Sequence, residues 1–389
     1  MTTEVADLDA AWVSYCDRVK AAGDSITTVT DDPRLRAEGY RYVQRLSNLA
    51  HQIYVEFGDT LTPTLFRYGD DVTPFGATNT DNNYSRAMLD PAGTYRITGD
   101  ISGVKELLIS IHDGEMVLGK LAVLAEVSLG DLKVDENGLL ELILGGTEVP
   151  GNWMPLSDAA VYVNIRQFVA DWERDPIAAL SIERLDIAAA ASNVTPSSVA
   201  VALERAATWV EASVAFWKMF SDGIKSATPI NDFNEPFRPP AAAVNMAHSS
   251  SWWELEPNQA LVVEFDVPVA TYWSIQTYLP HWLQPLDFAN RVTSLNDGQV
   301  HSDDDGKVRV VISATDPGVQ NWLDTSGLRE GLCSYRLVRP STEPKPTATV
   351  VDVADVRAHL PETTPVFGQK DRDAQISARR RGVARRFRC

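Results

Sequence analysis

The chain has 389 residues, a net charge of −18, 44% hydrophobic residues and 8% aromatic residues. This composition is typical of a globular protein with a sizeable core and excludes a disordered chain. Because binding to a phosphate backbone needs concentrated lysine and arginine, the charge also argues against a nucleic-acid partner.

The three cysteines, Cys16, Cys333 and Cys389, are scattered and show no metal-ligand spacing, which indicates a reducing compartment. The acidic N-terminus lacks the apolar segment of a secretory signal. No apolar run approaches the ~18–20 residues of a membrane span. We therefore expect a cytoplasmic protein with no membrane partner.

Residues 7–57 have a helical pattern. The side chains at spacings of three and four form one apolar face, which we expect to be buried. His51 lies away from that face, and we expect it to be solvated. The face comprises Tyr42, Leu46, Leu49, Ile53 and Phe57.

Turn residues dominate from Thr60 to Asp81, and strand-like alternation follows. Asp90–Gly93 is a turn signal between two short strands, which together predict a hairpin. The strands expected in this part are Tyr84–Leu89, Thr94–Thr98, Glu106–His112, Leu139–Leu144 and Ala160–Phe168.

Residues 170–230 return to a helical period, with a start signal at Thr195–Ser197 and a stop signal near Gly223. Residues 231–248 form a proline-rich connector, after which the strand pattern returns. The tail ends in a basic amphipathic helix with six arginines. We expect it to be a peripheral helix whose arginines are solvated and pair with acidic neighbours.

The strand-rich part of the chain is duplicated, with roughly residues 84–168 repeated as 250–338. Gly138 corresponds to Gly306, and Arg166 corresponds to Arg336. The pair Asn152–Trp153 corresponds to Asn321–Trp322. Each repeat offers about six short strands separated by turns, which favours an antiparallel architecture.

The fold class that we predict is α+β, mainly β, with internally duplicated antiparallel β-sandwich or jelly-roll units, a helical N-terminus, a helical insertion and a C-terminal helix. The expected segments are 1–60 (N-terminal helices), 61–169 (first β repeat), 170–235 (helical insertion), 236–340 (second β repeat) and 341–389 (tail with the basic helix).

Residues shared by both copies are expected to serve folding. We assign the two Asn-Trp pairs and the two arginines to this structural set. The acidic turn at 303–306 resembles a calcium loop, but the spacing excludes an EF-hand, because His301 and Ile312 stand where ligands are required. We predict a hairpin turn there and no metal site.

Two polar clusters occur in only one copy and are the candidates for chemistry. Residues 79–86 combine a carboxylate, a phenol and a guanidinium, which is a workable acid–base set when burial shifts their pKa values. Residues 272–282 would place polar and aromatic side chains on one face of a strand, followed by His281 as a general base. Aromatic core packing is the alternative for this second cluster.

The phrase TNTDNNYSRAMLDPAGTYRITGD and the stretch from Thr293 to Val338 resemble bacterial proteins with the domain of unknown function 1214, which often also carry the related domain 1254. This resemblance implies a β-sandwich or jelly-roll protein with helical insertions. It implies no catalytic residues.

We predict a cofactor-independent acid–base enzyme, a hydrolase or lyase, acting on a bulky small molecule such as a glycoside, steroid, terpenoid or aromatic metabolite. The alternative is a module that binds carbohydrate or another small ligand without catalysis. A homo-oligomer is compatible with either.

The candidate catalytic residues are Asp81, Tyr84, Arg86 and His281. The candidate substrate-binding residues are Asn79, Asn82, Asn83, Tyr272, Trp273, Gln276, Tyr278 and Trp282.

Overall fold

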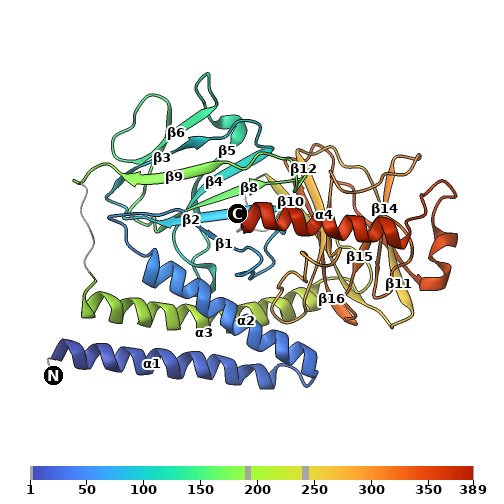
Figure 1. Ribbon diagram of the computed structural model, residues 1–389, viewed down its shortest axis with the longest axis horizontal. Coiled ribbons are helices and arrows are strands. Elements are labelled where there is room, and N and C mark those ends of the chain that lie inside the picture. The colour runs from blue at the N-terminus through green and yellow to red at the C-terminus, as the bar shows by residue number, and fades with distance from the viewer. Residues whose placement is uncertain (1–2, 189–193, 239–244, 389) are drawn as a thin grey trace. The chain divides into compact units, whose positions relative to one another are not determined.

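The computed structural model describes residues 3–188, 194–238 and 245–388 (Figure 1). It contains two compact units, each of which draws on separate parts of the chain. Part of the predicted proline-rich connector, residues 239–244, lies outside the described residues. Unit 1 comprises Met1–Phe75, Asn83–Gln167 and Pro176–Lys218, and unit 2 comprises Gly76–Asn82, Phe168–Asp175 and Met219–Cys389.

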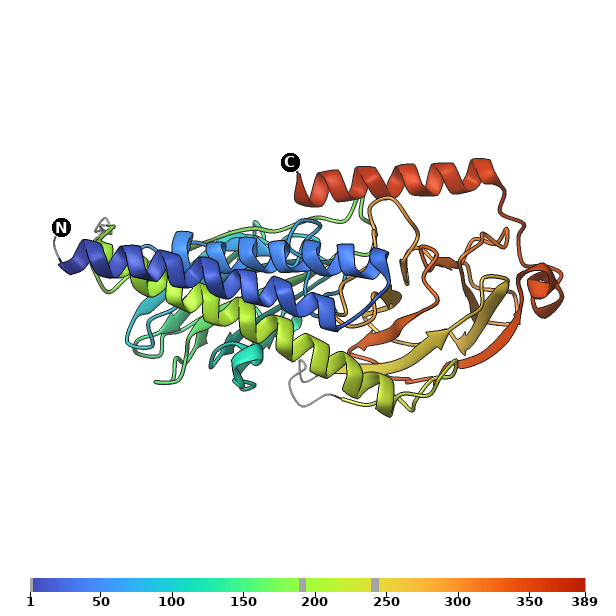
Figure 2. The ribbon, with the colours of Figure 1, turned by 90° about the horizontal axis from the view of Figure 1, so that it is seen from below.

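The helices of unit 1 form where the apolar periodicity predicts them. The carboxylate of Asp32 caps the second helix by accepting from the backbone N–H groups of Arg34 and Leu35. Tyr42, Leu46, Leu49 and Ile53 are buried, as predicted. Three helices lie side by side (Figures 1 and 2). They are α1 (Thr3–Ser25), α2 (Pro33–His51, extended by a π-helical turn at Gln52–Glu56) and α3 (Pro196–Ala227).

Unit 1 contains two sheets that pack face to face. Sheet A has the strand order β1-β2-β8-β4-β5, and sheet B has the order β7-β6-β3-β9. One buried hydrophobic cluster joins them, with Ala87 and Ile109 from sheet A and Ile97 and Leu142 from sheet B. The strands are β1 (Phe66–Tyr68), β2 (Asn82–Met88), β3 (Thr94–Asp100), β4 (Glu106–His112), β5 (Val123–Ser128), β6 (Leu139–Gly145), β7 (Asn152–Met154), β8 (Tyr162–Phe168) and β9 (Ala179–Arg184).

Unit 2 repeats this arrangement. Sheet C has the order β10-β16-β12-β13, and sheet D has the order β15-β14-β11-β17. Phe265 of sheet D packs on Trp273 and Tyr335 of sheet C. The elements are β10 (Met246–Glu254), β11 (Gln259–Asp266), β12 (Tyr272–Tyr278), β13 (Ser294–Asn296), β14 (Lys307–Ser313), β15 (Trp322–Asp324), β16 (Glu330–Val338), β17 (Thr347–Asp352) and the C-terminal helix α4 (Gln369–Phe387).

The two sandwiches have the same topology, strand for strand. Replacing β2 to β9 by β10 to β17 converts the orders of sheets A and B into those of sheets C and D, with β1 as an addition to sheet A. A parallel pairing of strands also corresponds between the copies, β6 with β7 and β14 with β15. The mainly β, duplicated fold predicted from the sequence is therefore present. The equivalence extends beyond the predicted repeat to β9 and β17.

The Asn-Trp pairs make the same contacts in both copies. Asn152 bonds the backbone N–H and carbonyl of Lys133 and the carbonyl of Glu141. Asn321 does the same with His301 and Arg309. The following tryptophan donates its indole N–H to a carbonyl at the end of the preceding strand, that of Gly145 or Ser313. Each asparagine thus ties two other segments of the chain together.

Two local expectations differ from the structure. Asp90–Gly93 connects β2 to β3, which belong to different sheets, so the chain crosses between layers there and forms no hairpin. Residues 170–230 were expected to have a helical period, but their first part contains the edge strand β9. β9 pairs with β3 along its whole length, and this pairing outweighs the helical pattern of the sequence.

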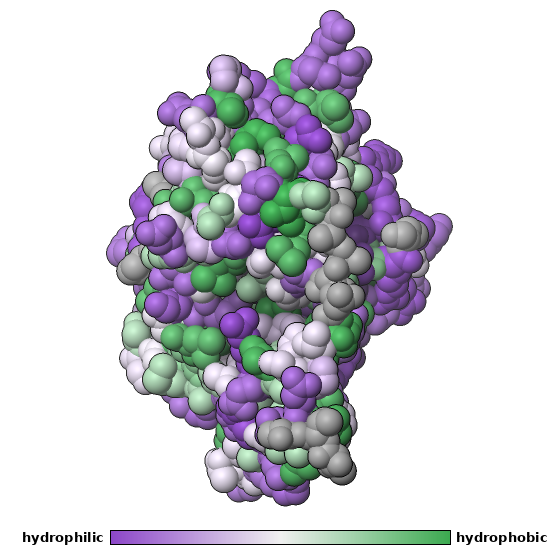
Figure 3. Space-filling view, turned by 90° about the vertical axis from the view of Figure 1, so that its left-hand side faces the viewer, coloured by the Kyte–Doolittle hydropathy of each residue, from purple (hydrophilic) through white to green (hydrophobic). Residues whose placement is uncertain are grey.

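None of the described helices combines the length and apolarity that crossing a bilayer requires. The face of the molecule in Figure 3 carries hydrophilic side chains interspersed with apolar ones, as expected for an acidic globular chain.

Replacing Asn321 by alanine should lower the free energy of unfolding by about 2 kcal/mol, because three backbone groups lose their partner in a buried place. Asn152→Ala should cost less, since its site is more exposed. Urea unfolding measures both. The control is Asn258→Ala, an exposed residue with one bond to Asp352. A cost for Asn321→Ala no larger than the control's would contradict the structural role.

Candidate functional site

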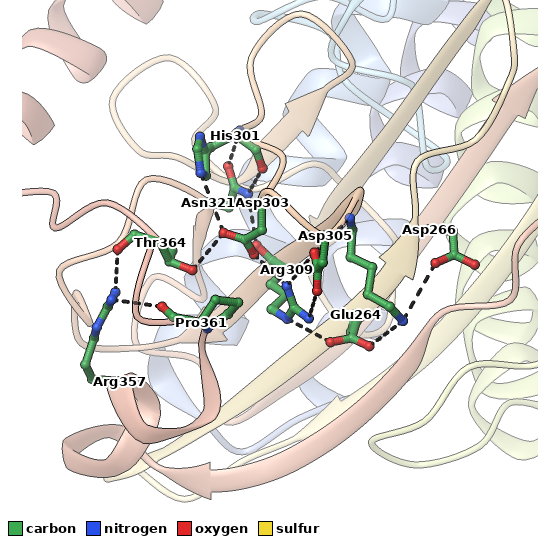
Figure 4. A network of polar contacts seen from close by, with 11 residues as sticks. Glu264, Asp266, His301, Asp303, Asp305, Arg309, Asn321, Arg357, Pro361 and Thr364 are labelled. Atoms are coloured by element: carbon green, nitrogen blue, oxygen red, sulfur yellow. Dashed lines mark hydrogen bonds and ion pairs between the residues drawn. The ribbon is translucent and has the colours of Figure 1, made fainter.

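The acidic turn of unit 2 is a structural network. Arg309 pairs with Asp303, Asp305 and Glu264, and Thr364 donates to Asp303 (2.7 Å; Figure 4). These carboxylates therefore already have partners within the chain. Over the described residues, no group of three or more His, Cys, Asp or Glu side chains is placed to hold a metal ion.

In unit 2, the segment Gly76–Asn82 lies on the polar face of sheet C. The Asn79 amide bonds the Tyr272 hydroxyl (2.9 Å) and accepts from the Gln276 amide (3.0 Å). Tyr278 donates to the carbonyl of Thr78 (3.0 Å). Tyr272, Gln276 and Tyr278 therefore share the face predicted for them by strand alternation.

Asp81 is the charged residue at the centre of this face, and its side chain is fully buried. It accepts from the Tyr272 hydroxyl (2.5 Å) and from the indole N–H of Trp172 (2.7 Å). Burial raises the pKa of Asp81, an effect that Tyr272 and Arg386 oppose. Because both oxygens have donors within the chain, this geometry supports a structural role more directly than a catalytic one.

The arginines of α4 correct the expectation of a solvated basic helix. Arg372, Arg379 and Arg386 are buried. Arg386 donates to the carbonyl of Thr80 (2.9 Å), and Arg379 donates to those of Phe288 and Ser294 (2.9 Å each). Burial lowers the pKa of Arg379 and of Arg386 to about 10, while the charge of Asp81 raises it. Arg380, Arg381 and Arg388 are exposed as predicted, and Arg381 pairs with the acidic side chain of Glu173.

The structure does not bring His281 to Asp81. Asp81 meets β12 at Tyr272, whereas His281 follows the other end of the strand, about 20 Å along a strand of seven residues. His281 has a left-handed backbone (φ 69°) and its ring lies against Trp282, which is buried. Trp273 points into the sandwich core, against Phe265.

The remaining predicted residues fall at the unit boundary or in unit 1. Asn82 is buried in unit 2, and its backbone N–H bonds the carbonyl of Asn79. Asn83, Tyr84 and Arg86 belong to β2 in unit 1. The predicted catalytic set is thus divided between the two units.

Arg86 lies in a second polar cluster, on the face of sheet A that points away from sheet B. Its guanidinium covers the Tyr162 ring at 3.8 Å, is buried, and pairs with Glu115. Glu115 also accepts from the indole N–H of Trp209 (3.2 Å). The Nε of Arg86 is a buried donor without a partner. Tyr84 joins the cluster through the ring of Tyr68 (5.5 Å).

His112 extends this cluster along β4. Its ring stacks on Tyr162 (4.9 Å, 7° between planes), and its Nε2 lies 2.9 Å from the Ser110 hydroxyl. Burial, followed by the charges of Arg166 and Arg86, lowers the pKa of His112 to about 3. The imidazole is therefore neutral near pH 7.

The same face differs between the two copies. In unit 2, Arg336 donates to the carbonyl of Ala77 (2.6 Å) and to the Tyr278 hydroxyl (2.5 Å). Its counterpart Arg166 is half-buried and, among the described residues, makes no hydrogen bond or ion pair. Sequence reasoning placed Arg166 in the structural set and passed over Ser110 and His112. The alternation of β4 already put those two on one face, but the arginines opposite them come from other strands.

These features define an internally duplicated, two-unit β-sandwich protein with a polar cluster on one sheet of each copy. A family model described as "Protein of unknown function (DUF1214)" matches residues 244–342, and the chain belongs to this family. The predicted resemblance is thereby confirmed.

Two solved structures resemble the chain. An uncharacterised protein from Burkholderia cenocepacia is 30% identical, with a TM-score of 0.82, over 88% of this chain and 97% of that chain. The VPA0106 protein from Vibrio parahaemolyticus is 11% identical, with a TM-score of 0.46, over 85% of this chain and 100% of that chain. A search of curated proteins found no match.

Replacing Asp81 by asparagine should lower the free energy of unfolding by about 3 kcal/mol, because the buried Arg386 loses a nearby negative charge. Thermal and urea unfolding test this against Asp304→Asn, an exposed carboxylate of the same unit. Equal stability of the two variants would contradict the structural role of Asp81 and would support a catalytic one.

The pKa of His112 predicts a stability change with pH. Its folded-state pKa is depressed from 6.5 to about 3, so its contribution is full above pH 6.5 and is lost as the pH falls toward 3. Between pH 7 and 5 this loss amounts to about 2 kcal/mol. In urea unfolding, His112→Gln should reduce the loss of unfolding free energy between pH 7 and 5 by that amount. Replacing the exposed His51 by glutamine should leave the loss unchanged. Parallel profiles for wild type and His112→Gln would contradict the assignment.

Proposed function

We propose that the polar face of sheet A in unit 1 binds a bulky small molecule that carries an anionic group, and that the protein is a cofactor-independent acid–base enzyme, a hydrolase or lyase. The observation that carries this proposal is the unpaired Arg166, whose counterpart Arg336 is satisfied by the chain itself. A guanidinium with all its donors available suits a carboxylate or another oxyanion.

The charge around His112 supports an anionic ligand. The charges of Arg166 and Arg86 add to burial in lowering the pKa of the imidazole, and Arg86 is paired with the carboxylate of Glu115, whereas Arg166 has no such partner among the described residues. Glu126 lies across from Ser110 on the neighbouring strand β5. The stacked rings of His112 and Tyr162 provide a flat surface beside these charges.

The chemistry would come from Ser110 and His112. The serine hydroxyl would give its proton to the neutral imidazole while its oxygen bonds to an acyl or glycosyl carbon. The bond from that carbon to the leaving group would break, and the imidazolium would return the proton to the leaving group. Water would then hydrolyse the covalent intermediate and restore the serine. Arg86 and Arg166 would stabilise the negative charge that develops. An anionic substrate would also offset the arginines and raise the pKa of His112 toward the range of a useful base.

Binding without catalysis is the second candidate function. The pKa of about 3 makes His112 a weak base in the absence of a ligand, which favours a module that only holds its ligand. The partner in both cases is a small molecule. We also propose a cytoplasmic location, because Cys16 and Cys333 are free thiols.

Binding is tested with 8-anilinonaphthalene-1-sulfonate, a bulky aromatic anion, and its uncharged relative N-phenyl-1-naphthylamine. Arg166→Leu should weaken the sulfonate about tenfold, the effect of one charge-assisted hydrogen bond, and leave the uncharged dye unchanged. Arg96→Leu is the control, since it removes an exposed arginine paired with Glu183 on sheet B. Unchanged sulfonate affinity in Arg166→Leu would sink the proposed site.

Catalysis is tested by release of p-nitrophenolate from p-nitrophenyl β-D-glucuronide, which carries a carboxylate, and from the matching glucoside, which does not. Ser110→Ala and His112→Gln should both abolish turnover of the glucuronide, and Ser110→Ala should change the affinity for the sulfonate dye less than twofold. Dye binding through Arg166 with no product from either compound would favour the binding module.

A further inference from the structure

Unit 2 contains a pocket of about 260 Å³ that the proposed site on sheet A does not use. It lies between the first half of α4, the segment around Trp172 and the loop that follows β13. Its apolar walls include Leu295 and Phe367, and Trp172 forms another side. The volume is slightly below the ~300–1,000 Å³ of pockets for drug-sized ligands, so it suits a single ring.

The charged groups at this pocket are already engaged. Each of the three nitrogens of Arg379 donates within the chain, to Phe288 and Ser294. Glu173 pairs with Arg381. The carboxylate of Asp171 accepts from two backbone N–H groups. A charged ligand would therefore have to displace existing bonds, whereas an uncharged one would not.

Three glutamine side chains supply the remaining polar groups. The Oε1 of Gln299 is a buried acceptor without a partner. Gln375 accepts from Arg372 through its Oε1 (2.5 Å), which fixes the amide and leaves its Nε2 as a donor. Gln320 holds the carbonyl of Gln299 through its Nε2 (3.3 Å), leaving its own oxygen as an acceptor. The lining of the pocket thus combines three amide side chains with apolar walls.

We propose that this pocket binds a neutral, polyhydroxylated ring the size of one monosaccharide. Hydroxyl groups both donate and accept, so they match a mixed set of amide groups, while the C–H surfaces of the ring pack on Phe367. The site belongs to unit 2 alone and is independent of the function proposed for sheet A.

The experiment is saturation-transfer NMR and calorimetry on the full chain with D-glucose, D-galactose and myo-inositol as probes, and with sodium acetate and sodium phosphate as anions. Ligands of this size bind with Kd values on the order of 1 mM. At least one neutral probe should bind in this range, and the anions should not compete.

Two variants locate the binding. Gln375→Ala should raise the Kd of the bound probe at least fivefold, and Ala378→Trp should abolish binding by filling the pocket. Gln369→Ala, an exposed glutamine of the same helix, is the control and should leave the Kd unchanged. Thermal unfolding of each variant verifies that it is folded, and if Ala378→Trp unfolds, the Gln375→Ala result decides alone.

Three outcomes would overturn the proposal. These are no binding of any neutral probe up to roughly 50 mM, well above the expected Kd; competition by acetate or phosphate; and equal affinity of wild type and Gln375→Ala. Each is distinct from the sulfonate-dye test of Arg166, so the two proposals fail separately.

Discussion

The organisation of unit 2 depends on the contacts that the buried carboxylate of Asp81 makes. Its two oxygens take the Tyr272 hydroxyl and the Trp172 indole, and its charge lies close to Arg386. Three parts of the chain that are distant in sequence meet there: the segment 76–82, the segment 168–175 and the helix α4. Because a buried guanidinium is costly without a nearby negative charge, the charge of Asp81 helps α4 to bury Arg379 and Arg386, whereas buried Arg372 pairs with Asp316.

The two sandwiches share a strand topology but differ in what covers one sheet. Both copies keep the same strand orders and the same asparagine clamp, since these hold a sandwich together whatever covers it. They differ in what occupies the polar face of one sheet. In unit 2 the chain's own segment 76–82 satisfies that face, including Arg336. In unit 1 the corresponding arginine, Arg166, lacks such a partner, and there we place the proposed chemistry.

The two proposed sites differ in electrostatics, and so they select different ligands. On sheet A, Arg166 lies near His112 without an ion-pair partner among the described residues, which favours an anion. In the unit 2 pocket, the charges are paired internally and amide groups remain, which favours an uncharged ligand. Membership of a family of unknown function is compatible with both, and a shared fold alone would support neither.

The sequence alone determined the elements that depend on local pattern. It predicted the duplication, the strand β4, the alternation of Tyr272 to Tyr278, and the turns at Gly138 and Gly306, whose φ values near +80° suit glycine. Only the tertiary structure decided that Arg379 and Arg386 are buried and that Ser110 and His112 face Arg166. Those outcomes depend on which side chains meet from distant segments and on whether each buried charge has a partner of opposite sign. The spacing of residues along one segment does not determine either.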